Sequence, residues 1–74
     1  MSVSSQQLYD FLKHHKGEEL HAEIEMLKDE RSCVTLFDKG IGIDWSESDA
    51  SIPTAIQWVE EMGFTYHLFS LSPV

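Results

Sequence analysis

The chain has 74 residues, of which 13 are acidic and only 5 are lysine or arginine, so its formal net charge is −8 at pH 7. A chain this short is expected to form one domain, residues 1–74, which buries only about 60% of its unfolded surface and is marginally stable. Because nucleic acids and anionic membranes are bound through clustered basic residues, direct binding of either is not expected. The apolar content of 42% argues against disorder.

The charges are divided unevenly along the chain. All five basic residues lie within the first 39 positions, whereas residues 40–74 contain both tryptophans, five acids and no lysine or arginine. Cys33 is the only cysteine, which excludes an intrachain disulfide and is typical of a reducing compartment. Residues 1–7 lack the basic and apolar regions of a secretory leader. We therefore expect a cytoplasmic location.

Residues 4–16 are predicted to form the first helix. Ser4 and Gln7 fit a capping box at its start, and Gly17 supplies the left-handed residue that often ends a helix. One face carries residues at helical spacing: Leu8, Phe11, Leu12 and His15.

Residues 18–27 are compatible with two structures. Apolar and polar residues alternate, which favours a strand, but the composition also suits a helix. We predict a strand because Gly17 ends the preceding helix and residues 33–37 offer a hairpin partner across a turn at 28–31. The alternative is a helix over 18–30, which would give a helical hairpin and a three-stranded sheet.

A third short strand is predicted over residues 41–45, where isoleucine and tryptophan alternate with glycine and aspartate. Gly42 within it indicates a bulge or a close approach of two backbones. Trp45 continues the isoleucine side of the strand, which favours burial of its ring. Residues 46–51 are predicted to form a polar loop.

The second helix is predicted to begin near Ser51 or Ile52, with Pro53 in its first turn, and to end at Gly63. Residues 64–71 are rich in aromatic residues and are predicted to form the last strand. The element order is thus α-β-β-β-α-β. We expect an α+β fold in two layers, with about four mostly antiparallel strands and two helices on one face of the sheet.

No catalytic or metal site is expected. His14 and His15 are adjacent on a helix and diverge, and no cysteine or histidine pairs have the spacing of a zinc site. Cys33 opens an apolar strand, where a lone cysteine is usually a small buried apolar residue. An enzyme that used Cys33 with a histidine would need a reactive thiol. We therefore predict a protein that is not an enzyme and has no cofactor.

The acidic residues of the second half suggest a surface that binds a basic partner. Ordinary surfaces mix both signs of charge, whereas this part of the chain has no cation of its own. Tryptophan among carboxylates is well suited to anchor an interface. Two patches, after Trp45 and on the second helix, give the predicted partner-binding residues: Asp44, Trp45, Glu47, Asp49, Gln57, Trp58, Glu60 and Glu61.

These features predict an acidic protein-interaction module. Its sharpest form is an inhibitor that blocks a basic surface of a nucleic-acid-binding protein or nuclease, with carboxylates in place of phosphates. In size and charge alone the chain resembles nuclease-immunity proteins and phage-encoded counter-defence proteins. The alternative is a small self-associating regulatory or ligand-binding domain, a homodimer formed through the last strand if its aromatic residues are exposed.

Overall fold

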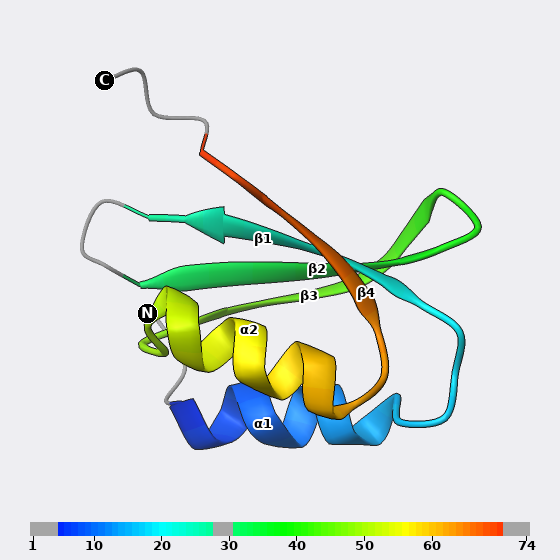
Figure 1. Ribbon diagram of the computed structural model, residues 1–74, viewed down its shortest axis with the longest axis horizontal. Helices are drawn as coiled ribbons and strands as arrows, with labels where there is room; N and C mark the ends of the chain where they lie inside the picture. Colours follow the sequence, from blue (N-terminus) through cyan, green and yellow to red (C-terminus); the bar gives the residue numbers. More distant parts are fainter. Residues whose placement is uncertain (1–4, 28–30, 71–74) are drawn as a thin grey trace.

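The computed structural model describes residues 5–27 and 31–70. Both helices lie against one face of a single four-stranded sheet (Figure 1). This arrangement confirms the predicted α+β fold, and the helical alternative for residues 18–30 is wrong because residues 21–26 form a strand. The elements in chain order are α1 (Ser5–His14), β1 (His21–Met26), β2 (Ser32–Asp38), β3 (Ile41–Ser48), α2 (Ile52–Glu61) and β4 (Thr65–Phe69).

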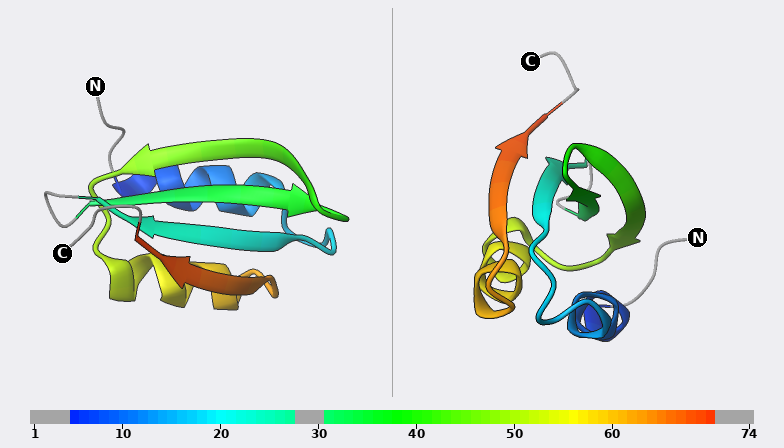
Figure 2. Two further views of the ribbon diagram at one scale, coloured as in Figure 1. Left: turned by 90° about the horizontal axis from the view of Figure 1, so that it is seen from above. Right: turned by 90° about the vertical axis from the view of Figure 1, so that its right-hand side faces the viewer.

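The strand order across the sheet is β3-β2-β1-β4. The neighbours β1 and β2 are antiparallel, as are β2 and β3, whereas β4 lies parallel to β1. The chain leaves β3 at one edge, passes through α2 beneath the sheet and returns as β4 at the other edge (Figures 1 and 2). This crossover makes β3 and β4 the two edge strands.

A two-residue turn joins β2 to β3. Asp38 pairs with Ile41, and the two residues between them both have positive φ, 53° at Lys39 and 84° at Gly40. Two consecutive left-handed residues are the mark of a type I′ turn, whose twist matches that of the flanking strands. Gly40 thus supplies one of the two left-handed residues that this turn needs.

The pairing of β2 with β3 contains a bulge. Phe37 lies opposite Gly42 while Leu36 lies opposite Asp44, so Ile43 is an extra residue in β3. A Cβ atom at Gly42 would stand 3.5 Å from the ring of Phe37. The predicted bulge is thus present, and the neighbour of Gly42 is the side chain of Phe37 at ordinary contact distance, not a second backbone.

The helix α2 begins and ends close to the predicted residues, with Ser51 at its start and Gly63 just after its end. The Ser51 hydroxyl accepts a hydrogen bond from a backbone N–H of the first turn at 3.4 Å. At the other end Gly63 has φ of 85°, and its N–H donates to the carbonyl of Glu60 at 3.0 Å. The N–H of Phe64 donates to the carbonyl of Val59 at 3.2 Å, which completes a Schellman motif.

Other predicted boundaries differ by a few residues. The first helix ends at His14, two residues before the predicted end, although Gly17 has the expected positive φ of 95°. The third strand continues to Ser48, so the predicted loop at 46–51 begins too early. Ser4 of the predicted capping box and most of the turn at 28–31 lie outside the described residues.

The core lies between the sheet and the two helices. Each described strand of the central pair sends alternate residues toward the helices, as the period of two predicts. Neither helix, within the part of the chain that the structure describes, is long and apolar enough to cross a bilayer. Eight fully buried apolar side chains form the centre of the core: Leu8, Leu12, Ala22, Ile24, Val34, Leu36, Ala55 and Val59.

Candidate protein-binding face

The sheet face opposite the helices is not covered by any described element (Figures 1 and 2). We call it the open face. The strand pairing assigns its residues, because partners that lie opposite each other in neighbouring strands point to the same side. Its members are His21, Glu23, Glu25, Cys33, Thr35, Phe37, Trp45, Glu47, Thr65, His67 and Phe69.

The open face is organised in rows that cross all four strands. One row runs from Trp45 through Thr35 and Glu23 to His67, and the next runs from Glu47 to Phe69. Side chains that lie directly opposite in such a row have Cβ atoms about 4.5–5.5 Å apart. The carboxylates of Glu23, Glu25 and Glu47 and the ring of Trp45 are therefore gathered on one surface from two strands, β1 and β3.

Trp45 is a large exposed apolar residue on the open face, with 62% of its surface accessible. The predicted burial of its ring is wrong. The prediction assumed an unbroken period of two from Ile41, but the extra residue Ile43 reverses the alternation. Ile41 therefore points to the helix side, and Trp45 points to the open face beside Thr35.

Two histidines and a carboxylate are connected across β1 and β4. The Glu23 carboxylate lies 3.0 Å from Nδ1 of His67 and 3.8 Å from Nε2 of His21. Nδ1 of His21 lies 2.8 Å from the hydroxyl of Thr65. These contacts orient the side chains along the β4 side of the open face.

At the β3 side, the Arg31 guanidinium donates a hydrogen bond to the Glu47 carboxylate at 3.0 Å. Both side chains are partly exposed, so this ion pair contributes little to stability. It holds the Glu47 carboxylate in place two residues along the strand from Trp45. The indole and this carboxylate thus share the β3 end of the open face.

Cys33 stands between two carboxylates in its row, Glu25 on β1 and Glu47 on β3. Burial raises the pKa of the Cys33 thiol, and both carboxylates raise it further, against a hydrogen bond with Thr35 that lowers it. A cysteine nucleophile needs the opposite shift, toward the thiolate at neutral pH. The open face therefore does not activate this thiol.

The predicted patch after Trp45 is divided between two sides of β3. Trp45 and Glu47 belong to the open face, but Asp44 points toward the helices. The Asp44 carboxylate lies 3.7 Å from Nε2 of His15 and accepts a hydrogen bond from the backbone N–H of Trp45 at 2.9 Å. Asp49 is exposed in the connection from β3 to α2.

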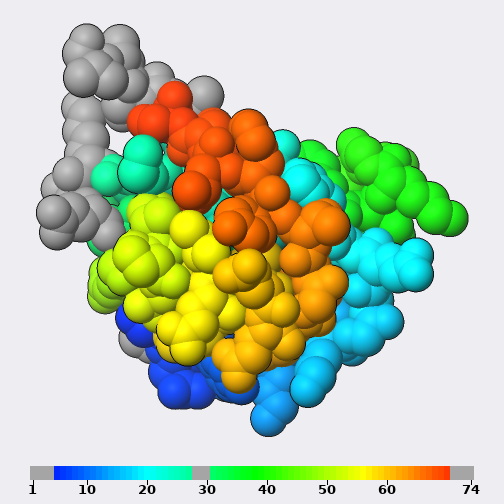
Figure 3. Space-filling view, viewed as in Figure 1, coloured from blue at the N-terminus to red at the C-terminus, as the bar shows by residue number. Residues whose placement is uncertain are grey.

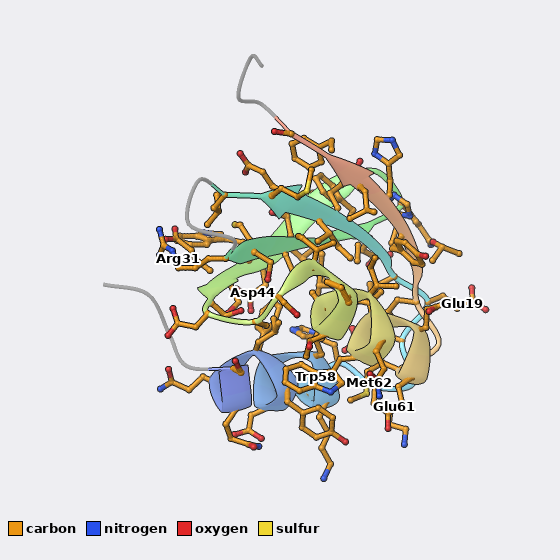
Figure 4. All side chains as sticks on the ribbon, turned by 60° about the vertical axis from the view of Figure 1, so that its left-hand side comes forward. Glu19, Arg31, Asp44, Trp58, Glu61 and Met62 are labelled. Atoms are coloured by element: carbon orange, nitrogen blue, oxygen red, sulfur yellow. The ribbon has the colours of Figure 1, made fainter. Side chains whose placement is uncertain are left out.

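The predicted patch on the second helix lies on another surface. Gln57, Glu60 and Glu61 are exposed on α2, a helix that lies on the side of the sheet away from the open face (Figure 1); Figure 4 labels Glu61 on this helix. Trp58 is half-buried and meets the ring of Tyr9 edge to face, with centroids 5.3 Å apart, so it joins the two helices. The eight predicted residues therefore do not form one continuous surface.

Two acidic residues of the open face, Glu23 and Glu25, are absent from the predicted site. Their alternation in β1 was visible in the sequence, but it fixes only that they share a side of their own strand. The strand register is what places them across from Thr35 and Cys33, and so near Trp45 and Glu47.

Within residues 5–27 and 31–70, no three histidine, cysteine, aspartate or glutamate side chains are grouped so as to hold a metal ion. Comparison of the chain with protein-family models, with curated protein sequences and with solved structures found no match.

Proposed function

We propose that this chain is a non-enzymatic protein-interaction module whose open face binds a basic surface of a partner protein. The observation that carries the proposal is the 62% exposure of Trp45 on a sheet face with three carboxylates. Tryptophan is enriched among the residues that dominate binding energy, and surrounding charges speed and orient the encounter. The net charge of −8 adds a long-range attraction to a cationic partner.

The most specific form of this proposal is inhibition of a nucleic-acid-binding protein or nuclease. Glu23 and Glu25 are two residues apart on one strand, so their Cα atoms lie about 6.6 Å apart. This separation is on the scale of successive phosphates in a nucleic-acid strand. A groove that binds phosphates through lysine and arginine could therefore accept the carboxylates of β1 and Glu47 in their place, with Trp45 as the apolar anchor.

The test compares two sets of charge-neutralising substitutions. Purified nucleases and nucleic-acid-binding proteins of the native host are screened for binding to the wild-type chain and to the triple variant Glu23→Gln, Glu25→Gln, Glu47→Gln. We expect the wild-type chain to bind one of them, to compete with its nucleic acid and to bind more weakly as salt rises. The triple variant is expected to lose most of this affinity.

The control makes the same type of substitution on the other surface, Glu60→Gln and Glu61→Gln on α2, and is compared with the double variant Glu23→Gln, Glu25→Gln, which also removes two charges. Glu60 and Glu61 are exposed and belong to the predicted helix patch, so their substitution removes two negative charges without touching the open face. It is expected to reduce affinity only slightly, through the smaller net charge. An affinity that does not change with salt, or a larger loss in the α2 variant, would contradict the proposal.

A further inference from the structure

The two edge strands differ in how they are protected against pairing with another chain. Natural edge strands are usually blocked by bulges, charged side chains or proline. β3 has two of these devices, the bulge at Ile43 and the charges of Asp44 and Glu47. β4 pairs with β1 over five consecutive positions without a shift, and it contains no bulge, no proline, no lysine and no acid.

Partly exposed apolar side chains border the free edge of β4. Tyr66 and Leu68 point to the helix side of the sheet and are 37% and 39% exposed. Ile52 and Ile56 of the neighbouring α2 are only partly buried against the core. In the space-filling view β4 and α2 form one continuous surface (Figure 3). Strand pairing at this edge would remove apolar area from water as well as satisfy backbone groups.

The local charge indicates what kind of chain can approach this edge. Residues 65–69 carry no acid in a chain whose net charge is −8. A basic partner finds no carboxylate to recognise on β4, whereas a second copy of this chain meets least electrostatic repulsion where the acids are absent. A domain of this size also commonly gains stability by association.

We propose that β4 pairs edge to edge with β4 of a second copy. A twofold axis perpendicular to the sheet makes the two strands antiparallel and joins the two four-stranded sheets into one. Tyr66 and Leu68 of both copies then lie side by side next to the two α2 helices. Both open faces lie on the same side of the dimer, with the two Trp45 side chains far apart near its outer edges.

The experiment measures the molar mass of the wild-type chain and two variants by sedimentation over a concentration series. Leu68→Lys places a charge beside the free edge of β4, and Ile41→Lys makes the same exchange on β3, where the side chain is 69% exposed. We expect a wild-type dimer, a dissociation constant raised at least about tenfold by Leu68→Lys, and no such change for Ile41→Lys. Circular dichroism verifies that both variants are folded.

Hydrogen exchange of the wild-type chain tests the same interface without any substitution. Amides of β4 are expected to exchange more slowly as the protein concentration rises, while those of the β3 edge are unaffected. A wild-type chain that remains monomeric up to about 1 mM would overturn the proposal. So would a dimer that is weakened by Ile41→Lys and not by Leu68→Lys, or β4 amides whose exchange is independent of concentration.

Discussion

The two faces of the sheet are built from alternate residues of the same strands, yet they differ in burial and in chemistry. On β2, Val34 and Leu36 are fully buried under the helices, whereas their neighbours Cys33 and Thr35 are only half-buried on the open face. On β1 the covered face holds alanine and isoleucine, and the open face holds histidine and glutamate. The buried apolar core thus lies on one face, and the other face is left uncovered by the described elements (Figure 1).

This division explains how a small domain can carry a strongly acidic surface. Repulsion among carboxylates opposes folding, but no described acidic side chain lies within the packed core: Glu23, Glu25 and Glu47 lie on the open face, and Glu60 and Glu61 are exposed on α2. Substitutions on the open face should therefore change binding far more than folding. Substitutions on the covered face should do the reverse.

The largest expected effect comes from Leu36→Ala on the covered face. Removing this fully buried side chain leaves a cavity, and the free energy of unfolding is expected to fall by about 2–5 kcal/mol. Thr35→Ala, on the open face of the same strand, is the control and should change it by less than about 1 kcal/mol. Urea unfolding followed by circular dichroism measures both, and equal losses would contradict the separation of the two faces.

Trp45→Ala should have the opposite effect to Leu36→Ala: a large change in binding and a small change in the free energy of unfolding. If the open face binds the proposed basic partner with the indole as its anchor, Trp45→Ala should weaken that binding by about 2–4 kcal/mol. The free energy of unfolding should change by less than about 0.5 kcal/mol, as is usual for an exposed side chain. Calorimetric titration and urea unfolding measure the two quantities.

The two tryptophans also provide a test that needs no partner. Iodide should quench the fluorescence of exposed Trp45 more strongly than that of Trp58, which packs on Tyr9. Trp45→Phe should therefore remove most of the quenchable emission, whereas Trp58→Phe should leave it. Equal quenching of the two variants would show that the ring of Trp45 is not exposed.

A smaller effect is expected from Ser32→Ala at the end of the covered face. The buried Ser32 hydroxyl donates to the carbonyl of Ala50 at 3.0 Å, and the Ser48 hydroxyl accepts from the Ala50 N–H at 3.2 Å. Without the Ser32 hydroxyl, the buried carbonyl of Ala50 loses this donor, and the free energy of unfolding should fall by about 1–3 kcal/mol. Ser46→Ala, at a half-buried position of β3, is the control and should be nearly neutral in urea unfolding.

The smallest expected effect concerns the pH dependence of stability through Cys33. Because burial and two carboxylates raise the pKa of this thiol, the folded chain keeps the proton at pH values where the unfolded chain has lost it. The free energy of unfolding should therefore fall as pH rises from the ordinary thiol pKa to the folded pKa. Cys33→Ser should lack this decrease when both proteins are unfolded in urea at neutral and alkaline pH. Identical pH profiles would contradict the raised pKa.

Much of the fold was predictable because its signals are local. Gly17, Gly40 and Gly63 have the positive φ that their positions at helix ends and in a turn demand. Alternation identified β1 and β2, although the return strand is longer by one residue at each end. The candidate site was less predictable. The sequence gives the neighbours of an acidic residue along its own strand or helix, but it does not give the residues that lie beside it in other strands.

The position of Trp45 shows most clearly how far the sequence can predict which side of the sheet a residue faces. A period-two pattern from Ile41 predicts that Trp45 shares its side, and Gly42 signals a bulge, but the sequence does not indicate which residue the bulge adds. The extra residue Ile43 moves Trp45 from the covered side to the open face. A one-residue irregularity in pairing thus changed a predicted core residue into the centre of the candidate site.

The sequence by itself determined the acidic character, the element order and most chain reversals, because charge, hydrophobic period and left-handed glycines act over a few residues. Only the tertiary structure decided which carboxylates share a surface, since strand order and register bring Glu23, Glu25 and Glu47 together from separate strands. It also decided that β4 lies at an edge, because the crossover through α2 places it beside β1. Such contacts depend on pairing between segments that are distant in the chain, which no local pattern specifies.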